Sequence, residues 1–266
     1  MIFETDYSID IAYLLRGKDD DWENCLNRFM RSYDQHRAGC KHKLHVIIKG
    51  FENKSDETRI RKHLSALECN VVHVDDDSFD LGAYRAWAEI VSANTICLLN
   101  TGSEILADCW LQKLYENFCD PSVGIVGATG SFESLGNGYD GFPHFPNPHI
   151  RSNAFMLQRH IYLEAAKGRL FQTKEDAFQF ESGNTGLTRI IKKLGLKPYI
   201  VGRNGRAYCE KTWALSNTFR QGRQHNLLVG DKQTRGYASS PWHQKKSLAS
   251  AAWGSTRNNW PLYRWG

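Results

Sequence analysis

The chain of 266 residues is 41% hydrophobic and 24% charged, as is ordinary for a soluble globular protein. No stretch approaches about 18 apolar residues, and no basic start precedes an apolar segment, so the sequence predicts neither a membrane span nor a signal peptide. The formal charge of +5 fits anionic small ligands, and the absence of a long Lys/Arg block argues against a nucleic-acid partner.

Cysteine usage points to the redox setting. The seven cysteines are odd in number and form no Cys-x-x-Cys pair, and Cys97 and Cys109 lie in apolar surroundings typical of small core residues. We therefore expect a reduced, cytoplasmic protein rather than a disulfide framework.

Strands and helices alternate along the chain. Apolar runs predict strands, and apolar residues at helical spacing predict helices. In chain order we expect a strand at residues 9–15, a helix at 22–33, a strand at 44–48, a helix at 57–67, a strand at 71–74, a helix at 81–94, a strand at 96–99, a helix at 110–118, strands at 123–126 and 154–157, helices at 161–166 and 187–194, and a strand at 198–201. This alternation predicts an α/β fold with a mostly parallel sheet and helices on both faces.

Two segments depart from this alternation. Residues 130–148 are rich in Gly, Pro, Asn and aromatic residues, which predicts a long loop of a kind that is often functional. Beyond Trp213 the chain turns polar and aromatic. We expect a single core at 8–212 and a C-terminal extension at 213–266, whose tryptophans dock on the core by default. The alternatives are that the extension folds over a ligand, or contacts a membrane surface or a neighbouring domain.

Polar residues follow the buried strand expected at 96–99. Asn100, Thr101 and Gly102 come directly after it, and ligands of α/β sheets gather at the carboxyl ends of such strands. Asp80 stands where the preceding helix begins, and a helix N-terminus favours phosphate. The alternative for Asp80 is a plain helix cap. Gly82, in the same turn, would let a ligand approach the backbone closely.

Residues 79–105 resemble nucleotide-sugar glycosyltransferases of the GT-A fold, and the first half of the chain resembles the nucleotide-binding half of their family-2-like members. The resemblance implies that the ends of the first two strands hold the base and ribose. At the matching positions this chain has Leu15-Arg16-Gly17 and Lys49-Gly50. It also implies that Asp80, Gly82 and the turn at 100–102 face the nucleotide.

The chain departs from this family at its metal motif. Members usually carry Asp-x-Asp to hold a divalent metal on the donor diphosphate, whereas this chain has Asn100-Thr101-Gly102, which also reads as a simple turn. We therefore predict no protein-held metal. Mg²⁺ or Mn²⁺ bound through the donor diphosphate, with oxygen ligands from Asn100 and Glu104, stays open. The basic candidates for neutralising phosphate instead are Arg16, Lys49, Arg151 and Arg203.

The segments 149–157 and 178–189 resemble the acceptor-side half of these enzymes. There a carboxylate takes the proton from the acceptor hydroxyl, and Glu181 is the acid nearest the matching place. We predict Glu181 as the general base, with a structural ion pair or cap as its alternative. The rival pair Glu175-Asp176 is expected on a solvated helix start. The residues expected on the acceptor or donor-sugar side are His149, Arg151, Ser152, Asn153 and Gly183.

The resemblance implies a glycosyltransferase that moves a sugar, with inversion, from a nucleoside-diphosphate sugar to a saccharide or lipid-linked saccharide acceptor. It further implies a role in bacterial surface polysaccharide synthesis, such as O antigen of lipopolysaccharide or capsule, in the cytoplasm or at the inner face of the membrane. The alternative is a non-catalytic GT-A-like saccharide-binding or scaffolding module of a larger polysaccharide-assembly protein. The missing Asp-x-Asp favours this module, whereas Glu181 and the polar turn at Asn100 favour an enzyme.

Overall fold

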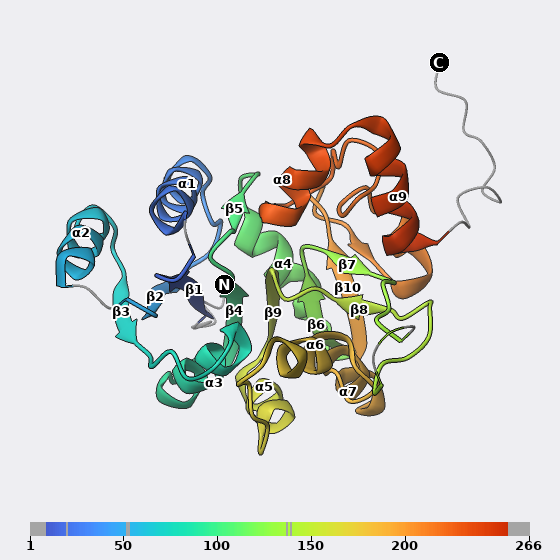
Figure 1. Ribbon diagram of the computed structural model, residues 1–266, viewed down its shortest axis with the longest axis horizontal. Helices are drawn as coiled ribbons and strands as arrows, with labels where there is room; N and C mark the ends of the chain where they lie inside the picture. The colour runs from blue at the N-terminus through green and yellow to red at the C-terminus, as the bar shows by residue number, and fades with distance from the viewer. Residues whose placement is uncertain (1–8, 20, 52–53, 137, 139, 255–266) are drawn as a thin grey trace, which may run out of the picture.

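The computed structural model describes residues 9–19, 21–51, 54–136, 138 and 140–254 of the chain. Within these ranges the central sheet has eight strands in the order β11-β10-β6-β9-β4-β1-β2-β3 (Figure 1). The strands are β1 (Ile9–Arg16), β2 (Lys43–Lys49), β3 (Asn70–His73), β4 (Thr95–Leu99), β6 (Val123–Gly127), β9 (Ala154–Gln158), β10 (Lys197–Val201) and β11 (Ala207–Tyr208).

The antiparallel direction of β9 determines which loops lie next to each other at the edge of the sheet. β1 runs parallel to β2 and β4, and β10 runs parallel to β6, so their carboxyl ends share one edge of the sheet. β9 lies antiparallel between β4 and β6. Its first residue, Ala154, pairs with Leu99 at the end of β4. The segment before β9 therefore lies beside the turn that follows β4.

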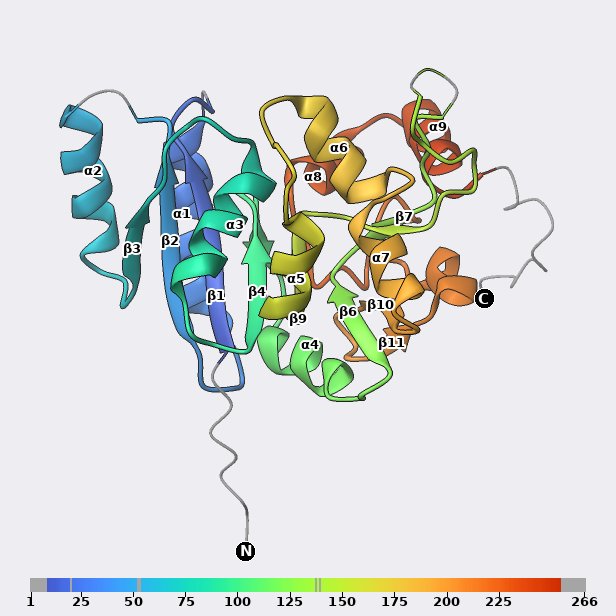
Figure 2. The same cartoon turned by 90° about the horizontal axis from the view of Figure 1, so that it is seen from below.

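Helices cover both faces of the sheet, as Figures 1 and 2 show. One face carries α1 (Trp22–Gln35), α2 (Lys54–Leu64) and α4 (Trp110–Phe118), and the other carries α3 (Asp80–Ile90), α5 (Arg159–Ala166), α6 (Lys174–Ser182) and α7 (Leu187–Lys193). Alternate residues of a strand point to opposite faces, so Ile11 and Tyr13 join the first core. Ala12 and Leu14 join the second. The predicted α/β class, with a mostly parallel sheet covered on both faces, is confirmed.

The C-terminal residues return to the carboxyl edge of the sheet. They form the 3₁₀ helix η1 (Glu210–Leu215), β12 (Val229–Gly230), α8 (Lys232–Ser239) and α9 (Trp242–Trp253). β12 pairs antiparallel with β5 (Glu104–Ile105), just after the polar turn that follows β4. Trp213 and Trp253 are buried, and their ring centres lie 6.1 and 5.2 Å from that of Phe132. This part of the chain therefore packs directly on the core.

The boundary expected between residues 212 and 213 falls inside η1. Trp260 and Trp265 lie outside the described residues. All seven cysteines lie within the described ranges and are free thiols. In the same part of the chain, no helix has both the length and the apolar character needed to cross a membrane.

The seven expected strands are all present, and the helix start expected at Glu175-Asp176 is the first turn of α6. The continuation of α6 to Ser182 was not predicted, nor were the helices α8 and α9. Phe178-Gln179-Phe180 alternates as an exposed strand edge would. A capping box between Thr173 and Asp176 instead starts α6, because each satisfies a backbone N–H of the other. Phe180 then packs edge-on against Tyr162 and Phe171 in the second core. Between β7 (Gly130–Ser131) and β8 (His149–Ile150) the described residues form the expected long loop.

Gly82 packs closely against its neighbours. A Cβ placed on it would lie 2.5 Å from the Ser78 Cβ and 3.1 Å from the Phe171 Cβ, inside the second core. We therefore expect Gly82→Val to lower the free energy of unfolding by about 1–3 kcal/mol through overpacking, as measured by chemical denaturation.

Gly236→Ala in α8 is the matched control, since nothing lies within 4 Å of the added Cβ. It should be neutral or raise stability by up to about 1 kcal/mol. A Gly82→Val protein of parental stability would contradict this packing role.

Candidate functional site

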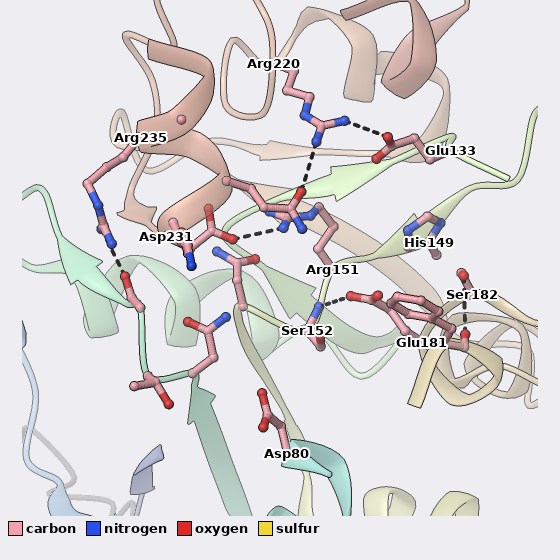
Figure 3. A pocket seen from close by; sticks show the side chains of 18 of the residues that line it. Asp80, Glu133, His149, Arg151, Ser152, Glu181, Ser182, Arg220, Asp231 and Arg235 are labelled. Carbon is pink, nitrogen blue, oxygen red and sulfur yellow. Dashed lines mark hydrogen bonds and ion pairs between the residues drawn. The ribbon is translucent and has the colours of Figure 1, made fainter. Parts of the chain in front are cut away.

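A cleft of about 1380 Å³ opens at the carboxyl edge of the sheet (Figure 3). Its walls come from the β1–α1 loop, the start of α3, the turn after β4, the segment before β9, the end of α6 and the C-terminal residues. The residues expected to carry function that line this cleft are Asp80, Asn100, Thr101, Gly102, His149, Arg151, Ser152, Asn153 and Glu181. Segments that are far apart in the sequence therefore come together at the carboxyl edge of the sheet, and they lie on both sides of β9.

The other expected residues do not line the cleft: Leu15, Arg16, Gly17, Lys49, Gly50, Gly82, Glu104, Gly183 and Arg203. Leu15 is fully buried in the first core. Gly17 packs so closely on the Gly50 carbonyl that a Cβ would lie 2.6 Å from it. Gly183 ends α6, and its N–H donates to the Gln179 carbonyl at 3.0 Å. These three positions shape the backbone around the site.

Lys49 is the buried member of an ion cluster beside the first two strands. Its side chain is 0% exposed, lies 3.2 Å from the Asp76 carboxylate and donates to the Ser78 carbonyl. Desolvation acts to raise the pKa of Asp76, but hydrogen bonds from Lys18 and Lys49 outweigh it and hold that pKa below its usual value. Arg16 lies 3.8 Å from the same carboxylate. Lys49 therefore ties β2 to the loop before α3 rather than reaching the cleft.

The turn after β4 is held from two sides. The Asn100 N–H donates to the Asn153 carbonyl at 3.1 Å, and the Ser103 hydroxyl donates to the Asn100 side chain at 3.1 Å. The Tyr13 hydroxyl of β1 donates to the Thr101 carbonyl at 2.9 Å. The backbone of this turn is therefore rigidly attached to β1 and β9. The Asn100 side-chain oxygen already accepts a hydrogen bond within the turn.

The carboxylates near this turn are paired with arginines. Glu104 lies 3.1 Å from Arg235 and 3.9 Å from Arg28. Asp231 lies 2.9 Å from Arg151. Across the described ranges, no group of three or more His, Cys, Asp or Glu is placed to hold a metal ion. Because a divalent cation needs oxygen ligands that are not committed to guanidinium groups, these residues do not fit a metal held by the protein.

Arg151 and Asp231 form the most deeply buried ion pair of the cleft, at 7% and 2% exposure. Desolvation acts to raise the pKa of Asp231, but the Arg151 charge and hydrogen bonds from Thr234 hold it below its usual value. The Arg151 guanidinium also lies 4.0 Å from the centre of the Phe219 ring, and Arg220 lies 4.7 Å from the same ring.

Arg220 enters the cleft from a strained segment. It donates to Glu133 at 2.6 Å and to Gln233 at 3.0 Å (Figure 3). Its φ is +49°, and the neighbouring non-glycine residues Asn217 and Gln224 also adopt positive φ, at +53° and +54°. Such conformations are costly outside glycine and persist where surrounding contacts impose them, often at functional sites.

Glu181 is held at the opposite side of the cleft from Arg235 in the view of Figure 3. One of its carboxylate oxygens accepts the Ser152 N–H at 2.6 Å. His149 is buried nearby, and its Nδ1 contacts the Asn147 carbonyl at 2.8 Å. Burial lowers the pKa of His149, although the Glu181 charge opposes this effect. The Glu181 carboxylate therefore lies close enough to the buried His149 ring for the two groups to interact electrostatically.

Two more polar groups complete the floor. Asn153 is 1% exposed, and neither N–H of its buried side-chain amide has a hydrogen-bond partner among the described residues. Asp80 stands in the first turn of α3. Desolvation raises the pKa of Asp80, against the opposing charge of Lys49.

The formal charges of the lining balance, with six basic and six acidic side chains. The basic residues are Lys18, Arg28, Arg151, Arg220, Lys232 and Arg235, and the acidic residues are Asp19, Asp21, Asp80, Glu133, Glu181 and Asp231.

Sequence reasoning missed the part that residues 220–236 play in this cleft. A local signal was present, because Asp231 precedes Thr234 by three residues and forms a capping box that starts α8. What brings α8 to the site is the pairing of β12 with β5, which no local pattern reveals.

No protein-family model matches this sequence, and no curated protein sequence matches it. Among solved structures, the chain is similar to a mannosyltransferase from Pyrobaculum calidifontis in complex with GDP-Man and Mn²⁺ (11% identity, TM-score 0.48, 71% of this chain and 53% of that one). It is similar to mouse xyloside xylosyltransferase 1 (12% identity, TM-score 0.45, 73% and 84%). It is also similar to a 4-diphosphocytidyl-2C-methyl-D-erythritol synthase from Anaerococcus prevotii (12% identity, TM-score 0.48, 73% and 86%). The chain spans about half the length of the mannosyltransferase. Similarities this weak carry no conclusion about the chemistry of the cleft.

Chelation should have little effect on ligand binding. Because Glu104 and Asp231 are committed to arginines, we expect EDTA to change the affinity for a nucleotide sugar by less than about tenfold, or 1.4 kcal/mol, in calorimetry. Complete loss of binding in EDTA, with recovery on adding Mn²⁺, would show that these carboxylates do serve a metal.

Removing the charge of Asp231 should destabilise the fold. Asn is an equally good helix cap, so Asp231→Asn mainly leaves the buried Arg151 unpaired, at a cost of about 3–5 kcal/mol in urea denaturation. Asp108→Asn is the control, since its carboxylate is 69% exposed beside His36, and it should cost less than about 1 kcal/mol.

The same pair should respond to pH. The folded-state pKa of Asp231 lies below its unfolded value of about 3.9, so its stabilisation is complete above about pH 4 and is lost as pH falls towards the folded value. The Asp231→Asn protein should lack this part of the acid dependence. Equal stability of variant and parent at pH 7 would contradict the assignment.

Proposed function

We propose that the protein is a glycosyltransferase that moves a sugar from a nucleoside-diphosphate sugar to a hydroxyl group of a saccharide acceptor. The observation that carries this proposal is the position of Glu181. Its carboxylate is oriented by the Ser152 N–H in the same cleft that the turn after β4 enters. One cleft thus combines an oriented base with the strand ends where α/β proteins bind nucleotides.

In this reaction Glu181 accepts the proton of the acceptor hydroxyl as its oxygen attacks the anomeric carbon. The bond from that carbon to the donor diphosphate breaks on the opposite face, so the configuration inverts. The Asn153 Nδ2 is a free donor for a sugar hydroxyl at the floor.

The departing diphosphate needs positive charge, which we assign to the start of α8. A Cβ on Gly102 would lie 3.2 Å from the Lys232 N–H nitrogen, so this helix end abuts the turn after β4. Arg235 already donates to the Gly102 carbonyl at 3.0 Å. Lys232 is exposed, and its ammonium has no ion-pair partner within the described chain. Together they supply, without a metal, the charge that phosphate oxygens require.

The setting of the reaction is inferred from the sequence resemblance. We propose a GT-A-like core at 8–212 with an extension at 213–266 that completes the cleft. The acceptor is a saccharide, free or lipid-linked, in bacterial surface polysaccharide synthesis, with the protein in the cytoplasm or at the inner face of the membrane. Trp242, 75% exposed with the Lys246 ammonium 5.8 Å from its ring centre, supports contact with a membrane surface.

A non-catalytic saccharide-binding module is the second candidate. The observation that favours it is the pairing of Glu104 and Asp231 with arginines, in place of free metal-binding carboxylates. Such a module would bind saccharide in the cleft but would not turn over a nucleotide sugar.

Substitution of Glu181 separates the two candidates. Glu181→Gln keeps the shape and removes proton acceptance, so turnover should fall by about 10²–10⁴-fold while nucleotide affinity hardly changes. The measurement is release of nucleoside diphosphate from a panel of UDP-, GDP- and dTDP-sugars with mixed saccharide acceptors. Binding of each nucleotide is measured in parallel by calorimetry.

Glu175→Gln is the matched control, because Glu175 lies on the same helix but is exposed at its first turn. It should keep most of the activity. Asp176 is a poorer control, since its carboxylate accepts the Thr173 N–H at 2.8 Å and caps α6. Normal turnover by Glu181→Gln would eliminate Glu181 as the base. Nucleotide binding without any turnover across the panel would favour the module.

A further inference from the structure

A second cavity, of about 600 Å³, lies along α1 and shares Asp21 and Arg28 with the cleft. Its opposite wall is formed by β5 and by Arg203, which follows β10. We call this cavity the α1 groove. Because the two cavities share these lining residues, the α1 groove directly adjoins the cleft.

The sequence of α1 builds this wall. Asn24, Arg28, Arg31 and Gln35 recur at i, i+4, i+7 and i+11, so they lie on one face of the helix and line the groove. The opposite face, with the buried Trp22, Leu26 and Phe29, packs on the sheet. A helix of 14 residues is about 21 Å long, so the polar face can accompany a ligand of several sugar units.

The charges of the groove are not all compensated. Arg28 lies 3.9 Å from Glu104, and His36 lies 3.3 Å from Asp108. Arg31 and Arg203 also line the groove and are exposed, and neither guanidinium has a hydrogen bond or ion pair within the described part of the chain. These two arginines are therefore available for an anionic ligand.

The other lining groups fit a saccharide. Asn24, Asn27 and Gln35 supply amides that both donate and accept hydrogen bonds, as sugar hydroxyls require. Guanidinium groups pair with carboxylates through two parallel hydrogen bonds. A ligand rich in hydroxyl groups that also carries carboxylates matches both features.

We propose that the α1 groove binds an acidic saccharide, with Arg31 and Arg203 pairing with its carboxylates. Resting on the proposed function, this makes the acceptor a uronic-acid-containing chain that enters the cleft past Arg28. The amides hold the sugar hydroxyls, and the two arginines select the acidic chain over a neutral one.

The test is binding of defined oligosaccharides by calorimetry at low salt. Tetragalacturonate should bind the parent protein at least about tenfold more tightly than maltotetraose, which has no carboxylate. The double variant Arg31→Ala/Arg203→Ala should lose this preference. Arg61→Ala, an exposed arginine on α2 away from the groove, is the matched control and should keep it.

Three results would overturn the proposal. They are equal binding of the acidic and neutral chains, unchanged preference in the double variant, and displacement of tetragalacturonate by an equal concentration of inorganic phosphate, which would identify a phosphate site. Binding of UDP and GDP is measured on the same proteins. If the protein binds nucleotide but does not prefer the acidic saccharide, only the proposal for the α1 groove is rejected. If it prefers the acidic saccharide but neither binds nor turns over a nucleotide, only the proposed transferase function is rejected.

Discussion

The cleft depends on the ion pair between Arg151 and Asp231. These residues are 80 positions apart, and their pairing at 2.9 Å joins the segment before β9 to the start of α8. Two charges buried this deeply are costly to desolvate, so the pair is maintained only because further hydrogen bonds satisfy it. Thr234 supplies one of them to Asp231, and Thr129 accepts one from Arg151. The C-terminal residues are therefore a structural wall of the site.

The antiparallel strand β9 sets the second condition. In an all-parallel sheet, the segment before each strand would lie at the edge opposite the strand ends. Because β9 runs against its neighbours, the residues that precede it lie beside the turn after β4. Ser152 then orients Glu181, and Asn153 anchors Asn100. One reversal of strand direction thus brings the proposed base and the proposed nucleotide edge into a single cavity.

Much of this architecture is readable from local patterns. The buried strands are mostly apolar, with exceptions such as Asp10 and His45, so their positions, and the polar residues at their ends, could be predicted from the sequence. Lys49 shows the limit, because a lysine at a strand end reads as a ligand-binding cation, whereas Asp76 and Ser78 enclose it. Arg220 and Asp231 could not be placed, since their positions depend on strand pairing and on Phe219 packing between distant segments. Long-range contacts determine such positions, and these contacts cannot be inferred from the local sequence pattern.

The balanced charge of the cleft has a consequence for encounter kinetics. Equal numbers of basic and acidic side chains give the lining no net formal charge, so the lining itself adds little field beyond a Debye length of about 8–10 Å to draw in the proposed anionic donor. The association rate of this donor should therefore lack electrostatic enhancement and should change little with ionic strength. Selectivity for the proposed donor would then come from an exchange of ion-pair partners inside the cavity, where its phosphate would compete with Glu104 for Arg235. The dissociation rate of a nucleotide would then depend on how well its phosphate replaces the Glu104 carboxylate. Donors would therefore differ in residence time rather than in association rate.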